Sequence, residues 1–324
     1  MEVQQLVPPH PVQTLAPQLA RWQTSASGTP YVHERKGKSP GPEVLVSALV
    51  HGNEYSGAIA LAELLAGTWL PVRGRVTFAF CNIAAFESFD SRVPDASRFV
   101  DEDLNRVWTR DRLDGPESSV EIQRARELRP YVERATHLLD LHSMHEPGAP
   151  LLITGTLARN VEFARSLRTG SQVVLDEGHA DGVRMRDYGD FSNPDGQRIS
   201  LLLEAGQHWA FQAVCVARDT LMRFLVGAGV ADPACLPGGW LLPDKVPPLP
   251  VEVTHRVVAQ SFDFRFTQTF SGGEKIANAG TLIATDCERD VVTPYDDCVL
   301  VMPSLRQLRP GVTTVRLGRL QPAA

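Results

Sequence analysis

The stretch with the clearest chemical content is His51-Gly-Asn-Glu54, which joins an apolar run to a helical pattern. Residues 44–50 are apolar apart from Ser47, as in a strand that is buried on both faces. From residue 58 to 65, the apolar residues follow a helical period and share one broad face. A histidine and a glutamate on the turn between strand and helix can both point at one ion. They would supply two of the three ligands of a zinc site made of two histidines and one glutamate.

Two further strand patterns end on residues that suit the same chemistry. One apolar pattern ends at His142, and another ends at Glu204. In open α/β sheets, ligands bind at the carboxyl ends of the strands, so these ends can meet on one side. His51, Glu54 and His142 could then bind one zinc ion per chain and leave a coordination position for water.

A second carboxylate and a group of cations complete the expected chemistry. Zinc lowers the pKa of a bound water to about 7, and a separate carboxylate must take its proton and pass it to the leaving group. Glu204 is the candidate, because a charge at the end of an apolar strand is costly without a partner. Arg98, Asn105 and Arg106 lie in a charged run. One arginine can hold a substrate carboxylate while the other stabilises the developing oxyanion.

The elements that would position these residues alternate between strands and helices. Beyond the first strand and helix, strands are expected at residues 75–82, 137–143, 151–154, 172–175 and 199–204, and helices at residues 116–134, 160–168 and 210–229. This alternation predicts a mostly parallel sheet with right-handed crossovers. Residues 1–41 are expected to be irregular, and Pro130 is expected to kink or break its helix. Residues 83–114 lack a regular period, and a loop of this length is usually functional.

Prolines and glycines crowd residues 231–250, which we interpret as a linker. The chain after it contains only short strand signals, which predict a small β-sandwich or barrel. We therefore expect a catalytic domain over residues 1–230, a linker over residues 231–250 and a small all-β domain over residues 251–324.

Composition limits the class of protein. The 324 residues are 43% hydrophobic and 22% charged, which allows a large core. The net charge of −6 argues against nucleic acid as a partner. No apolar run reaches about 18 residues and residues 1–21 lack a signal-peptide pattern, so no membrane association is expected. Five cysteines without a close pair favour a reducing cytoplasm. The sequence is compatible with a homo-oligomer.

Four short motifs give the chain a resemblance to a known family. In order along the chain, they are His51-Gly-Asn-Glu54, Asp103-Leu-Asn-Arg106, Asp140-Leu-His142 and Leu203-Glu204-Ala-Gly206. Their order and approximate spacing resemble those of the succinylglutamate desuccinylase/aspartoacylase family of the zinc carboxypeptidase-like clan. The resemblance covers about residues 44–230. It implies an α/β fold with a mostly parallel or mixed sheet flanked by helices, followed by a small all-β domain as in aspartoacylases.

The resemblance also implies roles for particular residues. Zinc would be bound by His51, Glu54 and His142, and Glu204 would be the general base and acid. The family's reaction is the hydrolysis of an N-acyl amino acid to a carboxylate and a free amino acid.

The substrate-binding residues are implied in the same way. Asn105 and Arg106 would bind the substrate carboxylate, and Arg98 lies where the family places an arginine that polarises the carbonyl. Tyr295 is a candidate for the C-terminal tyrosine that reaches the site in aspartoacylases. Whether Tyr295 or residues 177–198 reach the site is left open by the sequence.

We therefore expect a cytoplasmic zinc-dependent deacylase. It would hydrolyse a non-peptide carbon–nitrogen amide bond in a small N-acyl amino acid that carries a carboxylate. One alternative is a metallocarboxypeptidase that acts on a short or cell-wall-derived peptide, and a pocket narrowed by the β domain would favour the smaller substrate. Another alternative is a non-catalytic metal-binding protein, marked by loss of Glu204 or of a ligand, and this chain has lost neither. The acyl group, the amino acid and the native metal are not fixed by the sequence.

Overall fold

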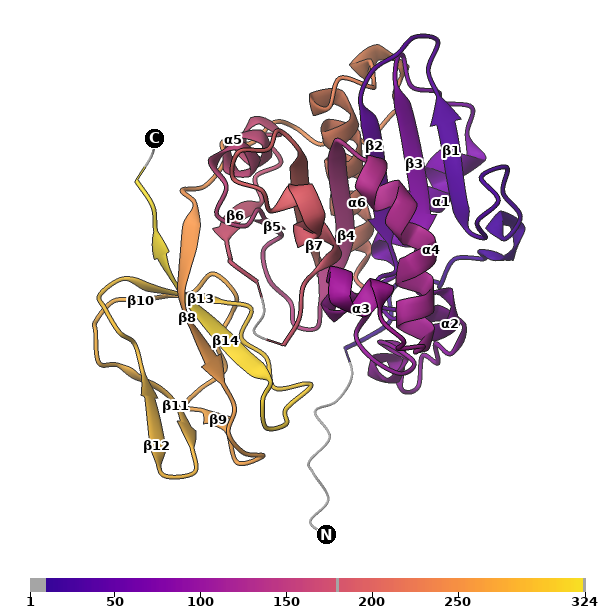
Figure 1. Cartoon of the computed structure of the whole chain (residues 1–324). Coiled ribbons are helices and arrows are strands. Elements are labelled where there is room, and N and C mark those ends of the chain that lie inside the picture. The colour runs from indigo at the N-terminus through magenta and orange to yellow at the C-terminus, as the bar shows by residue number, and fades with distance from the viewer. Residues whose placement is uncertain (1–9, 179–180, 323–324) are drawn as a thin grey trace.

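The computed structural model describes residues 10–178 and 181–322. They form a layered α/β body and, beside it, a β region that comprises residues 251–322 (Figure 1). The strands are β1 (Val32–Lys36), β2 (Glu43–Ala48), β3 (Arg75–Phe80), β4 (His137–Met144), β5 (Leu151–Ile153), β6 (Gln172–Leu175), β7 (Ile199–Gln207), β8 (Val251–Val258), β9 (Arg265–Phe266), β10 (Lys275–Ile276), β11 (Leu282–Asp286), β12 (Arg289–Val292), β13 (Cys298–Val301) and β14 (Thr313–Leu320). The α-helices are α1 (Ser56–Ala66), α2 (Ile83–Glu87), α3 (Arg110–Asp114), α4 (Val120–Arg134), α5 (Ala158–Ser166) and α6 (Phe211–Gly227). Short 3-10 turns are η1 (Ala20–Trp22), η2 (Pro94–Ser97), η3 (Leu104–Arg106), η4 (Met185–Asp187), η5 (Gly189–Phe191) and η6 (Pro233–Cys235).

The main sheet has a parallel centre and antiparallel additions. Strands β3, β2, β4 and β7 lie side by side and run parallel. Strand β1 pairs antiparallel with β3 at one side, and β5 pairs antiparallel with β7 at the other. The α/β fold with a mostly parallel, mixed sheet is therefore confirmed.

Helices cover both faces of this sheet, which explains why its central strands are apolar throughout. Along β2, Val44 and Val46 belong to the core cluster that also holds residues of α1 and α6. Leu45 points the other way, into the cluster that holds Ile122 and Leu128 of α4. Successive side chains of a strand point to opposite faces, so a strand between two helical layers has no polar side.

The main sheet does not stop where the β region begins. Strand β6 pairs in parallel with β8, and the sheet continues through β14, β13 and β10 to give 11 strands. Strands β9, β11 and β12 form a separate three-stranded sheet. These strands and their neighbours enclose a small core of their own around Phe264, Ile283 and Leu300.

The segment over residues 231–250 is packed along the body. The Leu242 carbonyl accepts a hydrogen bond from Arg223, and the backbone N–H of Lys245 donates to the Arg168 carbonyl at 3.0 Å. Trp240 packs against the main core. The segment is therefore an ordered strap along the surface.

Three local expectations differ from the structure. Residues 1–41 include strand β1, whose single buried residue, Val32, gives a weak strand pattern. Helix α4 is not broken at Pro130, and the buried side chains of Leu128 and Val132 pack both halves of the helix against the core. The long run after β3 contains short helical segments. Within residues 10–178 and 181–322, no helix has both the length and the apolar character needed to cross a bilayer.

Candidate active site

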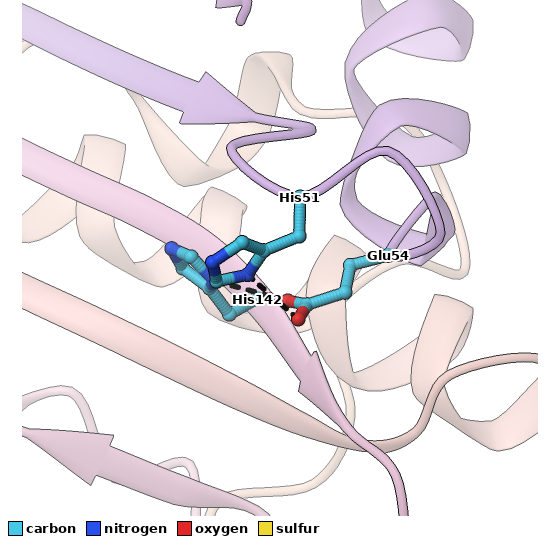
Figure 2. A group of neighbouring side chains, drawn as sticks. All are labelled: His51, Glu54 and His142. Atoms are coloured by element: carbon cyan, nitrogen blue, oxygen red, sulfur yellow. Dashed lines mark hydrogen bonds and ion pairs between the residues drawn. The ribbon is translucent and has the colours of Figure 1, made fainter. Parts of the chain in front are cut away.

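Three side chains from two neighbouring strand ends converge in the buried interior, and we call them the His–Glu–His cluster (Figure 2). His51 and Glu54 lie on the turn between β2 and α1, and His142 lies on β4. Each offers one ligand atom, and these atoms lie within 4.8 Å of one another. The Glu54 carboxylate makes both contacts, with its Oε1 2.8 Å from His51 Nδ1 and its Oε2 2.9 Å from His142 Nδ1.

Each histidine also contacts an aspartate through its second ring nitrogen, Nε2. His51 Nε2 lies 2.9 Å from Asp103 Oδ1, and His142 Nε2 lies 2.8 Å from Asp140 Oδ2. Carboxylates in this position fix the orientation of metal-binding imidazoles and leave the other ring nitrogen for the ion. Two imidazoles and one carboxylate, all buried and oriented in this way, fit a zinc ion.

The charged forms of Glu54 and His142 stabilise each other electrostatically. Burial raises the pKa of Glu54, but the two neighbouring histidines outweigh this effect and hold it well below its ordinary value. Burial lowers the pKa of His142, but Asp140 and Glu54 outweigh this effect and hold it well above its ordinary value. A cation at this position is therefore stabilised electrostatically.

The turn that carries the cluster depends on a close backbone approach at Gly52. A Cβ atom there would lie 2.5 Å from the Phe86 nitrogen and 2.5 Å from the Ser97 oxygen. The Gly52 N–H donates to the Arg98 carbonyl at 3.0 Å. The glycine of the motif thus lets the turn pack against the segment that presents Arg98.

Glu204 lies beside the cluster, on strand β7. It is the direct neighbour of His142 in the ladder between β4 and β7. Its side chain is buried, and its Oε2 atom has no hydrogen-bond partner among the described residues. Burial, with the nearby Glu54, raises the pKa of Glu204 to about 8, against a lowering by His142 and Arg98. A carboxylate that exchanges its proton near neutral pH suits general acid–base chemistry.

In the segment after β3, Arg98 and Asn105 contact the cluster and Arg106 lies beside them. Arg98 donates to Glu54 Oε1 and to Asp103 Oδ2, at 3.1 Å in each case. Asn105 accepts a hydrogen bond from the Met185 N–H at 2.9 Å, and its Nδ2 lies 3.5 Å from His142 Nε2. The neighbouring residue, Arg106, is mostly buried beside them.

One cavity of about 530 Å³ joins these groups. The predicted residues that line it are His51, Glu54, Arg98, Asn105, Arg106, His142 and Glu204. Residues 177–198 contribute Asp181 and Arg184. The β region closes the other side with residues of β8, β14 and the segment between β13 and β14.

Tyr295 is not among the residues that line this cavity. Its hydroxyl contacts Thr254 Oγ1 at 2.5 Å, and the Arg319 guanidinium lies over its ring at 4.2 Å. The segment between β12 and β13 therefore presents this tyrosine to β8 and β14 away from the site. From the β region, the cavity instead receives Arg256 and Arg316, which no local motif marks.

The fold and the cluster define an α/β protein with a buried two-histidine, one-carboxylate site at the carboxyl ends of its strands. Residues 40–218 match the family described as succinylglutamate desuccinylase/aspartoacylase catalytic domain. The chain belongs to this family, which is a family of deacylases.

Solved structures share the fold over most of the chain. A succinylglutamate desuccinylase from Vibrio parahaemolyticus has a TM-score of 0.64 at 16% identity, covering 89% of this chain and 86% of that chain. A succinylglutamate desuccinylase/aspartoacylase from Rhodobacter sphaeroides has a TM-score of 0.63 at 19% identity, covering 90% and 88%. The product-bound ectoine utilization protein EutE (DoeB) from Ruegeria pomeroyi has a TM-score of 0.62 at 20% identity, covering 89% and 87%. No curated protein matches the chain.

Proposed function

We propose that this protein is a zinc-dependent hydrolase that cleaves the amide bond of an N-acyl amino acid. The observation that carries the proposal is the buried His–Glu–His cluster with Glu204 next to it in one cavity. Among the described residues, the Oε2 atom of Glu204 has no hydrogen-bond partner. Membership of a deacylase family supports the same reaction class.

Different residues of the chain carry out different steps of the proposed reaction. His51, Glu54 and His142 would hold the ion, which supplies Lewis acidity and a water of lowered pKa when it is bound. Glu204 takes the proton from the attacking water and gives it to the leaving nitrogen. Arg98, whose guanidinium lies 3.1 Å from Glu54 Oε1, would stabilise the negative charge that develops on the carbonyl oxygen.

The substrate is proposed to be a small molecule with a carboxylate. Asn105 and Arg106 line the cavity next to the cluster, and the guanidinium of Arg106 has the shape to bind a carboxylate. A product-bound relative is consistent with a small ligand in this fold. The cavity volume of about 530 Å³ suits such a ligand.

The same proposal includes the organisation and location of the chain. We assign residues 1–230 to the catalytic domain, residues 231–250 to the connection and residues 251–324 to the β domain that completes the cavity wall. We also assign the protein to the cytoplasm, because each of its five cysteines is free.

Metal content and hydrolysis test this function together. Elemental analysis of the purified protein should find about one zinc per chain, as in three-ligand catalytic sites. His142→Ala should lose this zinc, and the wild type should hydrolyse at least one member of a panel of N-acyl amino acids. A wild-type protein that neither contains nor takes up zinc would refute the proposal.

A further inference from the structure

Two further histidines lie next to the cavity and have no role in the reaction described above. His208 follows the end of β7, and its ring contacts two residues that line the cavity. Its Nδ1 lies 2.8 Å from Ser143 Oγ, and its Nε2 lies 3.2 Å from His145 Nδ1. Asp95 completes the row, with its Oδ1 3.3 Å from His145 Nδ1. We call these four residues the serine–histidine row.

Ser143 lies next to the His–Glu–His cluster. It follows His142 directly on β4, and its backbone N–H donates to Glu54 Oε2 at 3.1 Å. The ladder between β4 and β7 shifts its register directly after the pair of His142 and Glu204. Successive residues of a regular strand point to opposite faces, whereas such irregularities re-aim side chains next to active sites. Ser143 lines the same cavity as His142 and Glu204.

The hydrogen bonds of the serine–histidine row run in one direction, and Asp95 determines it. Burial raises the pKa of Asp95, but the hydrogen bond from His145 and the charge of Arg306 outweigh this effect and hold it below its ordinary value. An ionised carboxylate only accepts hydrogen bonds, so His145 Nδ1 must carry the proton that faces it. The same N–H faces His208 Nε2, which must therefore be an unprotonated acceptor.

His208 then carries its proton on the other ring nitrogen. Burial and the neighbouring His145 lower the pKa of His208 well below its ordinary value, so the ring is neutral and holds a single proton. That proton lies on Nδ1 and is donated to Ser143 Oγ. No other described residue forms a hydrogen bond with this hydroxyl. Because a hydroxyl both accepts and donates, the hydrogen of Ser143 is free to bind a ligand in the cavity.

We propose that Ser143 donates a hydrogen bond to the carbonyl oxygen of the reacting amide, and that His208, His145 and Asp95 are positioning residues for its hydroxyl. A donor that is oriented in advance stabilises negative charge as it develops on that oxygen, without reorganisation. Ser143 keeps its proton throughout, since Glu204 carries the proton that is transferred. This inference rests on the proposed function, because that function supplies the amide substrate.

Removal of the hydroxyl tests the contact with the substrate in the zinc-saturated enzyme. Ser143→Ala should lower kcat about 10²-fold with little change in KM, as for the loss of one donor to a developing oxyanion. Ser171→Ala is the matched control, since Ser171 is also buried but does not line the cavity. Its kcat should equal that of the wild type. A Ser143→Ala enzyme with the kcat of the wild type would overturn the proposal.

Two exchanges at His208 test its positioning role. In His208→Asn the amide nitrogen can replace Nδ1 as the donor to Ser143, so kcat should stay within about threefold of the wild type. His208→Leu has no donor and should lower kcat about tenfold. In the Ser143→Ala background, His208→Leu should have no further effect on kcat, because the hydroxyl that it orients is absent. Equal losses in the two exchanges, or additive losses in the double variant, would leave the histidine a structural role only and refute the proposal.

The direction of the serine–histidine row can be measured without activity. In purified protein with ¹⁵N-labelled histidine rings, nuclear magnetic resonance distinguishes a protonated from an unprotonated ring nitrogen. The signals that are lost in His208→Asn should show a proton on Nδ1 and none on Nε2. The opposite arrangement would make Ser143 the donor to His208 and would exclude the proposed contact.

A binding measurement separates this proposal from the proposed function. Acetohydroxamate is a zinc-binding anion with a carbonyl oxygen, and calorimetry on the zinc-loaded protein should show about tenfold weaker binding to Ser143→Ala than to the wild type. If no amide is hydrolysed but this difference holds, the donor stands and the hydrolase function fails. Equal binding to both proteins, with amide hydrolysis intact, would reject the donor alone. A wild type that does not bind the probe and hydrolyses no amide would reject both.

Discussion

The two walls of the cavity are held in place in different ways. The His–Glu–His cluster is entirely buried, and each histidine has an aspartate behind it. The opposite wall contains the exposed Arg256 and the buried Arg316, and the pairing of β8 with β14 places these two residues. The first wall suits a fixed reaction, because its ligands have little freedom to move. The second wall lies on β8 and β14, whereas the cluster and Glu204 lie on the turn after β2 and on β4 and β7.

The largest effect is expected at Glu204. Glu204→Gln should lower kcat about 10²- to 10⁴-fold, because the variant cannot take up the proton. Zinc content should remain near one per chain, since Glu204 is not one of the cluster ligands. Stopped assays on the best N-acyl amino acid, with elemental analysis of the same sample, measure both quantities. If Glu204→Gln remained active, another group in the cavity would have to carry the proton.

The next largest effect is expected at Asp140, which contacts His142 of the cluster. Asp140→Asn should weaken zinc affinity about 10- to 100-fold, because it removes the carboxylate that orients His142. Competition with a chelating dye measures the affinity. Asp286→Asn is a matched control, since Asp286 is a buried aspartate of the β region that binds Ser261 and Gln260. Equal zinc affinity in the Asp140 variant and the wild type would contradict this account of the first wall.

The stability of the metal-free protein should depend on pH through Glu204, which lies beside the cluster. The pKa of Glu204 is raised from 4.5 to about 8 in the folded state, so the folded protein keeps a proton that the unfolded chain releases in this range. Stability should therefore fall as pH rises from 4.5 toward 8, by up to about 1.4 kcal/mol for each unit of pKa difference. Glu204→Gln should lack this contribution. Urea unfolding in EDTA, at several pH values, measures the difference between the two proteins, and parallel curves would count against it.

The smallest effect is expected at Tyr295, which lies in the β region outside the cavity. Tyr295→Phe should change kcat/KM by less than about twofold and stability by about 1 kcal/mol, since it removes a hydroxyl that contacts Thr254 and Cys298 in the β region. Steady-state kinetics and thermal unfolding check these values. A loss of tenfold or more in kcat/KM would contradict this prediction and support a role for Tyr295 in the active site.

The cluster could be predicted from the sequence because each of its residues follows a local pattern. An apolar strand precedes His51, and another runs into His142, so both could be placed at strand ends without knowledge of the strand order. Glu204 could be found for the same reason. The fold of the body follows from the same alternation of strands and helices.

The second wall could not be predicted in this way. Arg316 lies in an alternating strand, where a polar residue usually faces solvent, and only the pairing with β8 and the contact with Asp176 bring it to the cavity. The family resemblance makes Tyr295 a candidate, but the segment that holds it turns toward Thr254. Contacts between distant segments decide both cases, and neither leaves a local pattern.

The parallel pairing of β6 with β8 has a mechanical consequence. Val174 lies opposite Val251 and Leu175 opposite Glu252, so the catalytic body and the β region share backbone hydrogen bonds as well as a connecting strap. A protease cut within residues 231–250 would remove the covalent tether and leave this ladder intact. The two fragments should therefore stay together through gel filtration, and the cavity between them should survive the cut.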